Sequence, residues 1–180
     1  MDSRYAVLVT VSEEGDQTLV GRTLLQKKIF FANLITGQDF GFRPHYFGPY
    51  SRMVADATDS LVSNRFLEEQ VHLFGDSNEF GEIRRHQYSV TADGADVLKS
   101  LKGDPEVLAW KDALRLVNSH EDSRDFNILS IAAKVVVITG GAVSQRESEV
   151  AERAKAYGWD LSPRDVRRVI GFLSHVKLTK

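Results

Sequence analysis

The most constraining feature of the sequence is a change of hydrophobic period between residues 66 and 91. Apolar side chains alternate with polar ones here, around Leu67 in the first half and around Tyr88 in the second. A period of two is typical of β-strands with one buried face. The polar, glycine-containing stretch 75–82 separates the two halves as a hairpin loop does. The pattern therefore predicts one two-stranded hairpin.

Helical patterns lie on both sides of this hairpin. Before it, apolar residues recur near the 3.6 period over about residues 20–36 and 51–64, with Ser51 as N-cap of the second helix. A short third strand is expected near residues 42–46, and Gln26, Lys27 and Asn33 are expected on the solvent side of the first helix. After the hairpin, helices are predicted from Thr91 and over about residues 105–118, 126–138, 144–157 and 162–176. The expected fold class is α+β, mostly α.

Two apolar runs, residues 5–11 and 134–139, stay open between helix and strand because short apolar runs fit both. The second run leads into two glycines and is similar to the first strand and turn of a dinucleotide-binding fold. That fold needs further glycines and a longer chain after them, so a buried helix end or a strand is expected instead. The best internal boundary, residues 102–104, divides the chain into residues 1–103 and a helical subdomain of residues 104–180.

Composition excludes several classes of function. The 180 residues carry 23 Lys+Arg against 25 Asp+Glu, a formal net charge of -2, so bulk charge alone would not hold the chain on nucleic acid or an anionic membrane. The absence of cysteine excludes disulfide frameworks and cysteine-based metal sites or nucleophiles. No apolar run is long enough to span a membrane and no signal-peptide pattern is present. A cytoplasmic protein is therefore expected.

Three sequence motifs carry a resemblance to a known family. Residues 88–94, YSVTADG, are similar to the Y-x-L-T-x-x-G that closes the wing of many winged helix-turn-helix proteins. Residues 21–27, GRTLLQK, and 45–51, HYFGPYS, resemble the G-x-T-x-L-Q-K and H-Y-G-P-Y-S of the YwgA-like proteins and the related Panacea (SocA-type) domains, the last with one inserted residue. The resemblance covers about residues 4–100 and implies a winged-helix domain over residues 1–103. It implies no chemistry, because the group includes domains taken to bind DNA and domains that bind other proteins.

A winged helix that binds DNA places its recognition helix in the major groove and its wing along the backbone. The recognition helix here would be residues 51–64. Its polar side chains, with basic residues on the preceding helix and on the wing, could contact phosphates and base edges of double-stranded DNA. These candidate DNA-binding residues are Arg22, Lys27, Lys28, Arg52, Ser60, Asn64, Arg84 and Arg85. A transcriptional regulator is the first hypothesis for function.

Acidic residues on the same elements favour another hypothesis. Asp56 and Asp59 lie on the same general side as Arg52, and the hairpin loop 75–82 carries three carboxylates of its own, Asp76, Glu79 and Glu82. Carboxylates that face phosphates repel them. The second hypothesis is an interaction or antitoxin-like module that binds a protein without DNA. A continuous positive surface across the recognition helix and the wing would favour DNA, and a mixed or acidic surface would favour a protein.

No catalytic or metal-binding constellation emerges from the sequence. The five histidines show no metal-ligand spacing, and His72 and His86 would form a pair only in one register of the hairpin. We therefore expect no enzymatic activity, no metal and no cofactor. Winged-helix proteins usually act in pairs, and the apolar-striped helices after residue 103 exceed what the hairpin needs for cover. A homodimer is expected.

Overall fold

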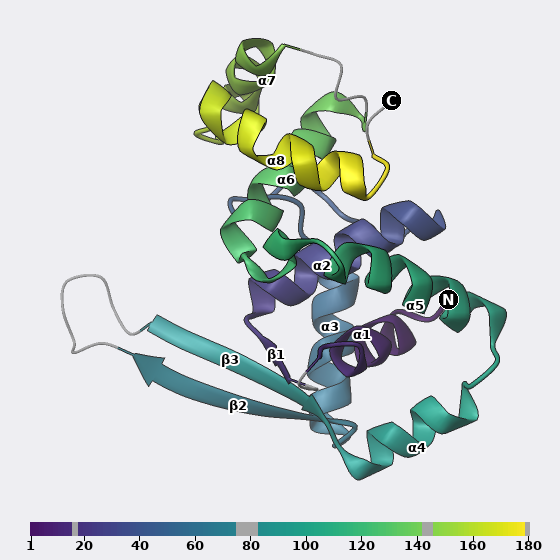
Figure 1. Cartoon of the computed structure of the whole chain (residues 1–180). Helices are drawn as coiled ribbons and strands as arrows, with labels where there is room; N and C mark the ends of the chain where they lie inside the picture. Colours follow the sequence, from purple (N-terminus) through teal and green to yellow (C-terminus); the bar gives the residue numbers. More distant parts are fainter. Residues whose placement is uncertain (16–17, 75–82, 142–145, 179–180) are drawn as a thin grey trace.

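The structure, a computed structural model, describes residues 1–15, 18–74, 83–141 and 146–178. It is α+β and mostly helical: the described part contains eight α-helices, two 3₁₀ helices and one three-stranded antiparallel sheet (Figure 1). None of the described helices is long and apolar enough to cross a bilayer. In chain order the elements are α1 (Ser3–Ser12), β1 (Thr18–Val20), α2 (Arg22–Thr36), α3 (Arg52–Ser63), β2 (Leu67–Phe74), β3 (Ile83–Val90), α4 (Ala92–Ser100), α5 (Pro105–Asn118), η1 (Glu121–Arg124), α6 (Phe126–Thr139), α7 (Glu147–Ala154), η2 (Lys155–Tyr157) and α8 (Pro163–His175).

The predicted hairpin forms, and a third strand extends it into a sheet. β2 pairs antiparallel with β3, starting with Leu67 opposite Val90, and β1 pairs with the other edge of β3 to give the order β1-β3-β2. The expected position of the third strand, residues 42–46, is wrong. That segment contributes an isolated bridge between Arg43 and Tyr50. The three residues of β1 are too few for an alternating pattern to reveal them.

The first core lies between the sheet and helices α1, α2, α3 and α5. α1 buries every residue from Ala6 to Val11, because α2, α3, α5 and β3 all contact it. Trp110 of α5 is fully buried in this core, and its Nε1 donates to Thr10 Oγ1 at 3.1 Å. Residues 5–11, which the sequence left open, are helical. A helix covered on all sides is apolar all round and shows no period.

The second core is formed by α6, α7 and α8 against the far side of α2. Phe31 of α2 packs edge to face on Phe172 of α8, with 4.9 Å between the ring centres. The other ambiguous run, residues 134–139, is also helical and belongs to α6. Gly140 ends α6 in the left-handed conformation, at a φ of 65°, which glycine adopts without the strain that a side chain adds. The glycine pair therefore terminates a helix.

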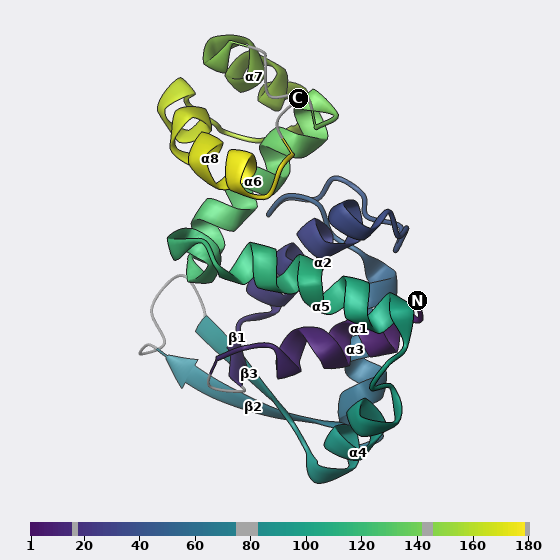
Figure 2. The same cartoon turned by 45° about the vertical axis from the view of Figure 1, so that its right-hand side comes forward.

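α2 lies between the two cores, with α5 on one side and α6 on another (Figures 1 and 2). All residues from Leu24 to Asn33 are consequently buried. Gln26, Lys27 and Asn33 are only 6%, 2% and 6% exposed, so the expectation that they face solvent is wrong. A helical period identifies the more polar side of a helix, but it does not show whether a second layer covers that side.

The helices after residue 103 belong to both cores. α5 follows the predicted boundary at residues 102–104, yet its apolar side chains, including Val107 and Trp110, pack in the first core. α8 begins with a capping box in which Ser162 Oγ accepts from the Asp165 backbone N–H, and its apolar stripe is buried within the same chain. The apolar side chains of α5 and α8 are thus buried within one chain, and their burial does not require a second copy. The homodimer remains a prediction.

Candidate functional site

The surface predicted to bind a ligand consists of α3 and the base of the hairpin. α3 begins at its predicted cap, where Ser51 Oγ accepts a hydrogen bond from the Val54 backbone N–H at 3.1 Å. The side-chain amide of Gln26 on α2 holds the same residue. It accepts from the Ser51 backbone N–H and donates to the Ser51 carbonyl oxygen, at 3.0 Å each. This double hydrogen bond fixes the start of α3 relative to α2.

The exposed side of α3 carries charges of both signs. We call Arg52, Met53, Asp56 and Asp59, all of which are exposed, the α3 face. Arg52 Nε donates to Asp56 Oδ1 at 2.8 Å, one helical turn further on. Met53 exposes 49% of its surface although it is apolar. The face therefore combines one paired arginine, a second carboxylate and an exposed apolar side chain.

An open groove of about 750 Å³ runs beside the α3 face, between α3 and the first residues of the chain. Met53, Ala57 and Phe40 form part of its apolar lining, and Ser60 also lines it. Asn64, the other polar contact predicted on this helix, donates from Nδ2 to the Ser60 carbonyl oxygen at 2.8 Å. Of these two predicted residues, Ser60 thus lies at a groove and Asn64 caps the end of the helix.

Glu69 on β2 is the centre of a polar cluster at the hairpin base. Its Oε1 accepts from the Tyr88 hydroxyl at 2.6 Å and from Arg22 Nη2 at 3.0 Å, and lies 2.8 Å from His86 Nδ1. Arg22 also lies 3.8 Å from Asp59 Oδ1 of the α3 face. Burial opposes ionisation of Glu69, but these hydrogen bonds outweigh it and hold its pKa below the ordinary value. The predicted DNA contact Arg22 is therefore already paired with carboxylates.

Lys27 and Lys28, which we expected to contact phosphates, are only 2% and 1% exposed. Lys27 Nζ donates to the Pro49 carbonyl oxygen at 2.7 Å, and burial, followed by repulsion from Lys134, lowers its pKa to about 8. Lys28 Nζ forms a buried ion pair with Glu14. These contacts correct the expectation that the two lysines lie on an accessible surface. α6 and the segment before α3 cover Lys27, and the residues after α1 and the end of α5 enclose Lys28.

The two arginines predicted on the wing are consecutive residues of β3. Arg85 is exposed and lies opposite His72, whereas the side chain of Arg84 and the acidic loop 75–82 lie outside the described residues. His86 is one position further along the strand, so the two histidines are not directly opposite each other and do not form the pair that one register would have allowed. Among the described residues, no group of three His, Asp or Glu side chains is placed to hold a metal ion.

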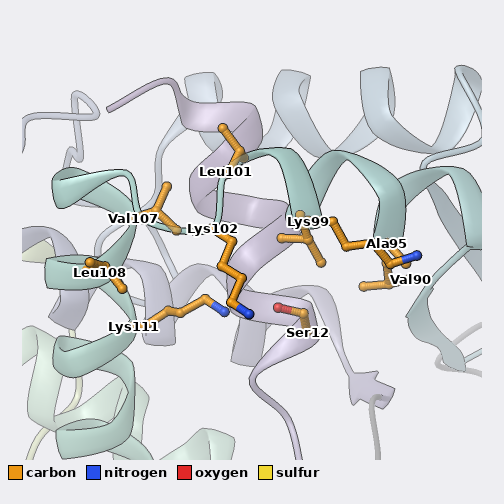
Figure 3. Close-up of a pocket in the computed structure, with 11 residues that line it drawn as sticks. Ser12, Val90, Ala95, Lys99, Leu101, Lys102, Val107, Leu108 and Lys111 are labelled. Atoms are coloured by element: carbon orange, nitrogen blue, oxygen red, sulfur yellow. The ribbon is translucent and has the colours of Figure 1, made fainter.

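Sequence reasoning missed a pocket of about 390 Å³ between α4, α5 and the end of α1 (Figure 3). Its size falls within the roughly 300–1,000 Å³ of typical ligand pockets. Apolar side chains of α4 and α5 line it together with Lys99, Lys102 and Lys111. Exposed lysines are ordinary on and after helices, so no local signal could have indicated that these three share a pocket.

The α3 face and the hairpin base together form a mixed surface. Arg22 and Arg52 are bound to carboxylates of the same surface, and Met53 is exposed beside a groove. Interfaces between proteins combine such features, with an apolar centre and a polar, charge-paired rim.

Comparison of the sequence with protein-family models and with curated proteins gives no match.

Proposed function

We propose that the chain is a winged-helix module that binds a partner protein through the α3 face and the groove beside it. The order of elements supports the winged-helix assignment: helix, strand, two helices, an antiparallel hairpin and a further helix. The sequence resemblance implies the same kind of domain over residues 1–103. Because one fold hosts many functions, the choice of partner rests on the surface of α3 and not on the fold.

The observation that carries the choice of a protein partner is the pairing of the arginines. Arg52 is 2.8 Å from Asp56, and Arg22 is 3.0 Å from Glu69 and 3.8 Å from Asp59. Two arginines and three carboxylates therefore share this surface. Double-stranded DNA presents one phosphate charge about every 1.7 Å along its axis and would be repelled by these carboxylates. A protein surface with both signs of charge can complement them.

The apolar part of the surface supplies an anchor point. Met53 is half exposed at the edge of the groove, and methionine adapts to partners of irregular shape. An apolar side chain of the partner that enters the groove would contact Met53 and Ala57. A few such anchors contribute most of the binding free energy in protein interfaces, and paired charges around them set the orientation.

A second candidate function, a DNA-binding regulator, is favoured by the position of Arg52. It lies in the first turn of α3, where recognition helices contact bases, and its side chain is 83% exposed. Exposed ion pairs contribute only about 0–1 kcal/mol, so a phosphate or a guanine could replace Asp56 as its partner. Arg85 adds a second exposed cation on β3.

Fluorescence anisotropy with a labelled duplex of mixed sequence separates the two functions. We expect wild-type protein at about ten micromolar to leave the duplex unbound at physiological salt, because affinity requires net phosphate neutralisation. The double variant Asp56→Asn, Asp59→Asn removes two repulsive charges and should bind the duplex weakly at low salt. Binding of the duplex by wild-type protein, with loss of that binding in Arg52→Ala, would instead contradict the protein-binding proposal and favour the DNA-binding regulator.

Photo-crosslinking tests the protein partner directly. A photo-reactive phenylalanine derivative at position Met53, in cells that naturally make the protein, should give a discrete protein adduct, and the same group at Glu152 of α7 should not. The partner identified in this way is then purified. Met53→Glu should weaken its binding at least tenfold by placing a charge at the anchor point, whereas Glu152→Lys should not. Equal amounts of adduct at both positions would contradict the proposal. A partner that binds Met53→Glu as tightly as wild type would contradict it too.

A further inference from the structure

α4 is attached to the rest of the chain mainly through its first turn. Of its nine residues, Gly94 is the buried one, and a Cβ built there would lie 2.2 Å from the Phe66 carbonyl oxygen. The backbone of α4 is therefore pressed against the start of the hairpin. Further along, Leu98 and Leu101 pack against the first core but stay only partly buried. The helix is fixed at one end and incompletely covered at the other.

The space left by this arrangement is the pocket of about 390 Å³ between α4, α5 and the end of α1 (Figure 3). Leu108 of α5, on its rim, is 50% exposed, although leucine is usually buried. The apolar side chains that line the pocket come from β3, α4, the following turn and α5: Val90, Ala95, Leu98, Leu101, Val107 and Leu108. An apolar ligand chain in this space would complete the burial that α4 and α5 leave unfinished.

The charges around the pocket leave one excess positive charge. Lys99 Nζ lies 2.7 Å from Asp96, and Lys111 Nζ lies 3.0 Å from Glu13. Lys102 also lines the pocket, and its ammonium group has no ion pair or hydrogen bond with another described residue. A pocket with a single uncompensated cation favours a ligand with a single negative charge.

The polar groups converge on one side of the pocket. Figure 3 shows the ammonium ends of Lys102 and Lys111 pointing toward the hydroxyl of Ser12. An ammonium group has three donor hydrogens, so Lys111 can donate to a ligand and to Glu13 at the same time. The hydroxyl of Ser12 donates to the Val9 carbonyl oxygen at 2.8 Å. This hydrogen bond fixes the position of the hydroxyl at the end of α1. A carboxylate between the two lysines would receive charge-assisted hydrogen bonds from both.

We propose that this pocket binds an amphipathic monocarboxylate, with its apolar chain between α4 and α5 and its carboxylate on Lys102 and Lys111. The apolar lining requires a chain, and the single excess charge requires a monoanion. The proposal concerns a different surface from the α3 face, so its outcome is independent of the partner protein.

Isothermal titration calorimetry with decanoate, below the concentration at which it aggregates, tests the site. We expect saturable binding of one decanoate per chain, with amide NMR shifts concentrated in α4 and α5. Acetate has the head group without the chain, and 1-decanol has the chain without the charge. Each should bind at least tenfold more weakly than decanoate. Equal affinity for decanoate and decanol would overturn the proposal, and so would binding of several decanoates with shifts spread over the molecule.

Variants assign the two halves of the ligand to their residues. Lys102→Met should weaken decanoate binding about tenfold, the effect of one charge-assisted hydrogen bond, and leave decanol binding unchanged. Leu108→Ser should weaken decanoate and decanol alike. Lys155→Met removes an exposed lysine of η2 and should change neither the affinity for decanoate nor that for decanol. Melting curves of all three variants verify that they are folded, and unchanged decanoate affinity in folded Lys102→Met would refute the site.

Discussion

Replacement of Lys27 by methionine tests whether α2 is truly enclosed by two cores. Lys27 is 2% exposed, and its pKa falls from the ordinary 10.5 to about 8 through burial and the proximity of Lys134. The unfolded chain therefore binds more protons than the folded protein between about pH 8 and 10.5, so the free energy of unfolding must rise with pH in that window. Since one pH unit corresponds to about 1.36 kcal/mol, the full rise is about 3 kcal/mol.

The assay is urea unfolding of wild type and Lys27→Met at several pH values from about 7 to 10. Methionine keeps a long unbranched chain and removes the charge, so the difference in unfolding free energy between the two proteins isolates the titration of Lys27. We expect this difference to change by about 2–3 kcal/mol in favour of wild type over the range. The range stops at pH 10 because burial and a hydrogen bond to Glu69 raise the pKa of Tyr88. A phenol that titrates later when folded lowers stability above that pH.

Lys155→Met serves as the matched control, because it removes a lysine that is exposed. Its difference from wild type should stay flat over the same range. A flat difference for Lys27→Met as well would refute the reasoning. It would mean that the ammonium group meets water in the folded protein, and that the second core does not cover α2 in solution.

Gly94→Ala should destabilise the protein by about 2 kcal/mol or more, because the new Cβ would meet the Phe66 carbonyl oxygen at 2.2 Å. Gly171→Ala on α8, where a Cβ meets nothing within 4 Å, should instead stabilise it by roughly 0.5–1 kcal/mol. Thermal melting checks both, and similar melting temperatures would contradict the packing of α4. Glu69→Gln should speed amide hydrogen exchange in β2 and β3, since it removes the negative charge that Arg22 and the Tyr88 hydroxyl bind at the hairpin base. Unchanged exchange rates would contradict a stabilising role of the Glu69 cluster in the hairpin. Light scattering should give twice the 20.2 kDa chain mass if the predicted homodimer forms, and a single chain mass would reject it.

Elements whose signals are local could be predicted from the sequence. The hairpin follows from alternation of apolar and polar residues, and three helix starts follow from caps. Ser51, Thr91 and Asp104 each accept a hydrogen bond from a backbone N–H two or three residues further on. Such a bond joins neighbours in the chain, so the residues that make it can be recognised without knowledge of the rest of the fold.

Features that depend on distant parts of the chain could not be predicted in this way. The strand β1 is defined by its pairing with β3, about seventy residues later, as Thr18 opposite Ser89 shows. The pairing of Arg22 with Glu69 likewise joins α2 to the hairpin. In both cases the partner is chosen by the register of strands and the docking of helices, and neither leaves a local pattern.

Burial is the main reason why the residues of the candidate site could not be predicted from the sequence. Lys27 and Arg22 are both basic residues of one predicted helix, and the same local pattern applied to both. The packing of α6 and the segment before α3 over α2 buries the first, whereas the second stays at the surface beside Glu69. The pocket between α4 and α5 arises in the same way, from the distance between two packed helices. Exposure is a property of all the layers around a residue, and only the assembled layers determine which charges remain available to a ligand.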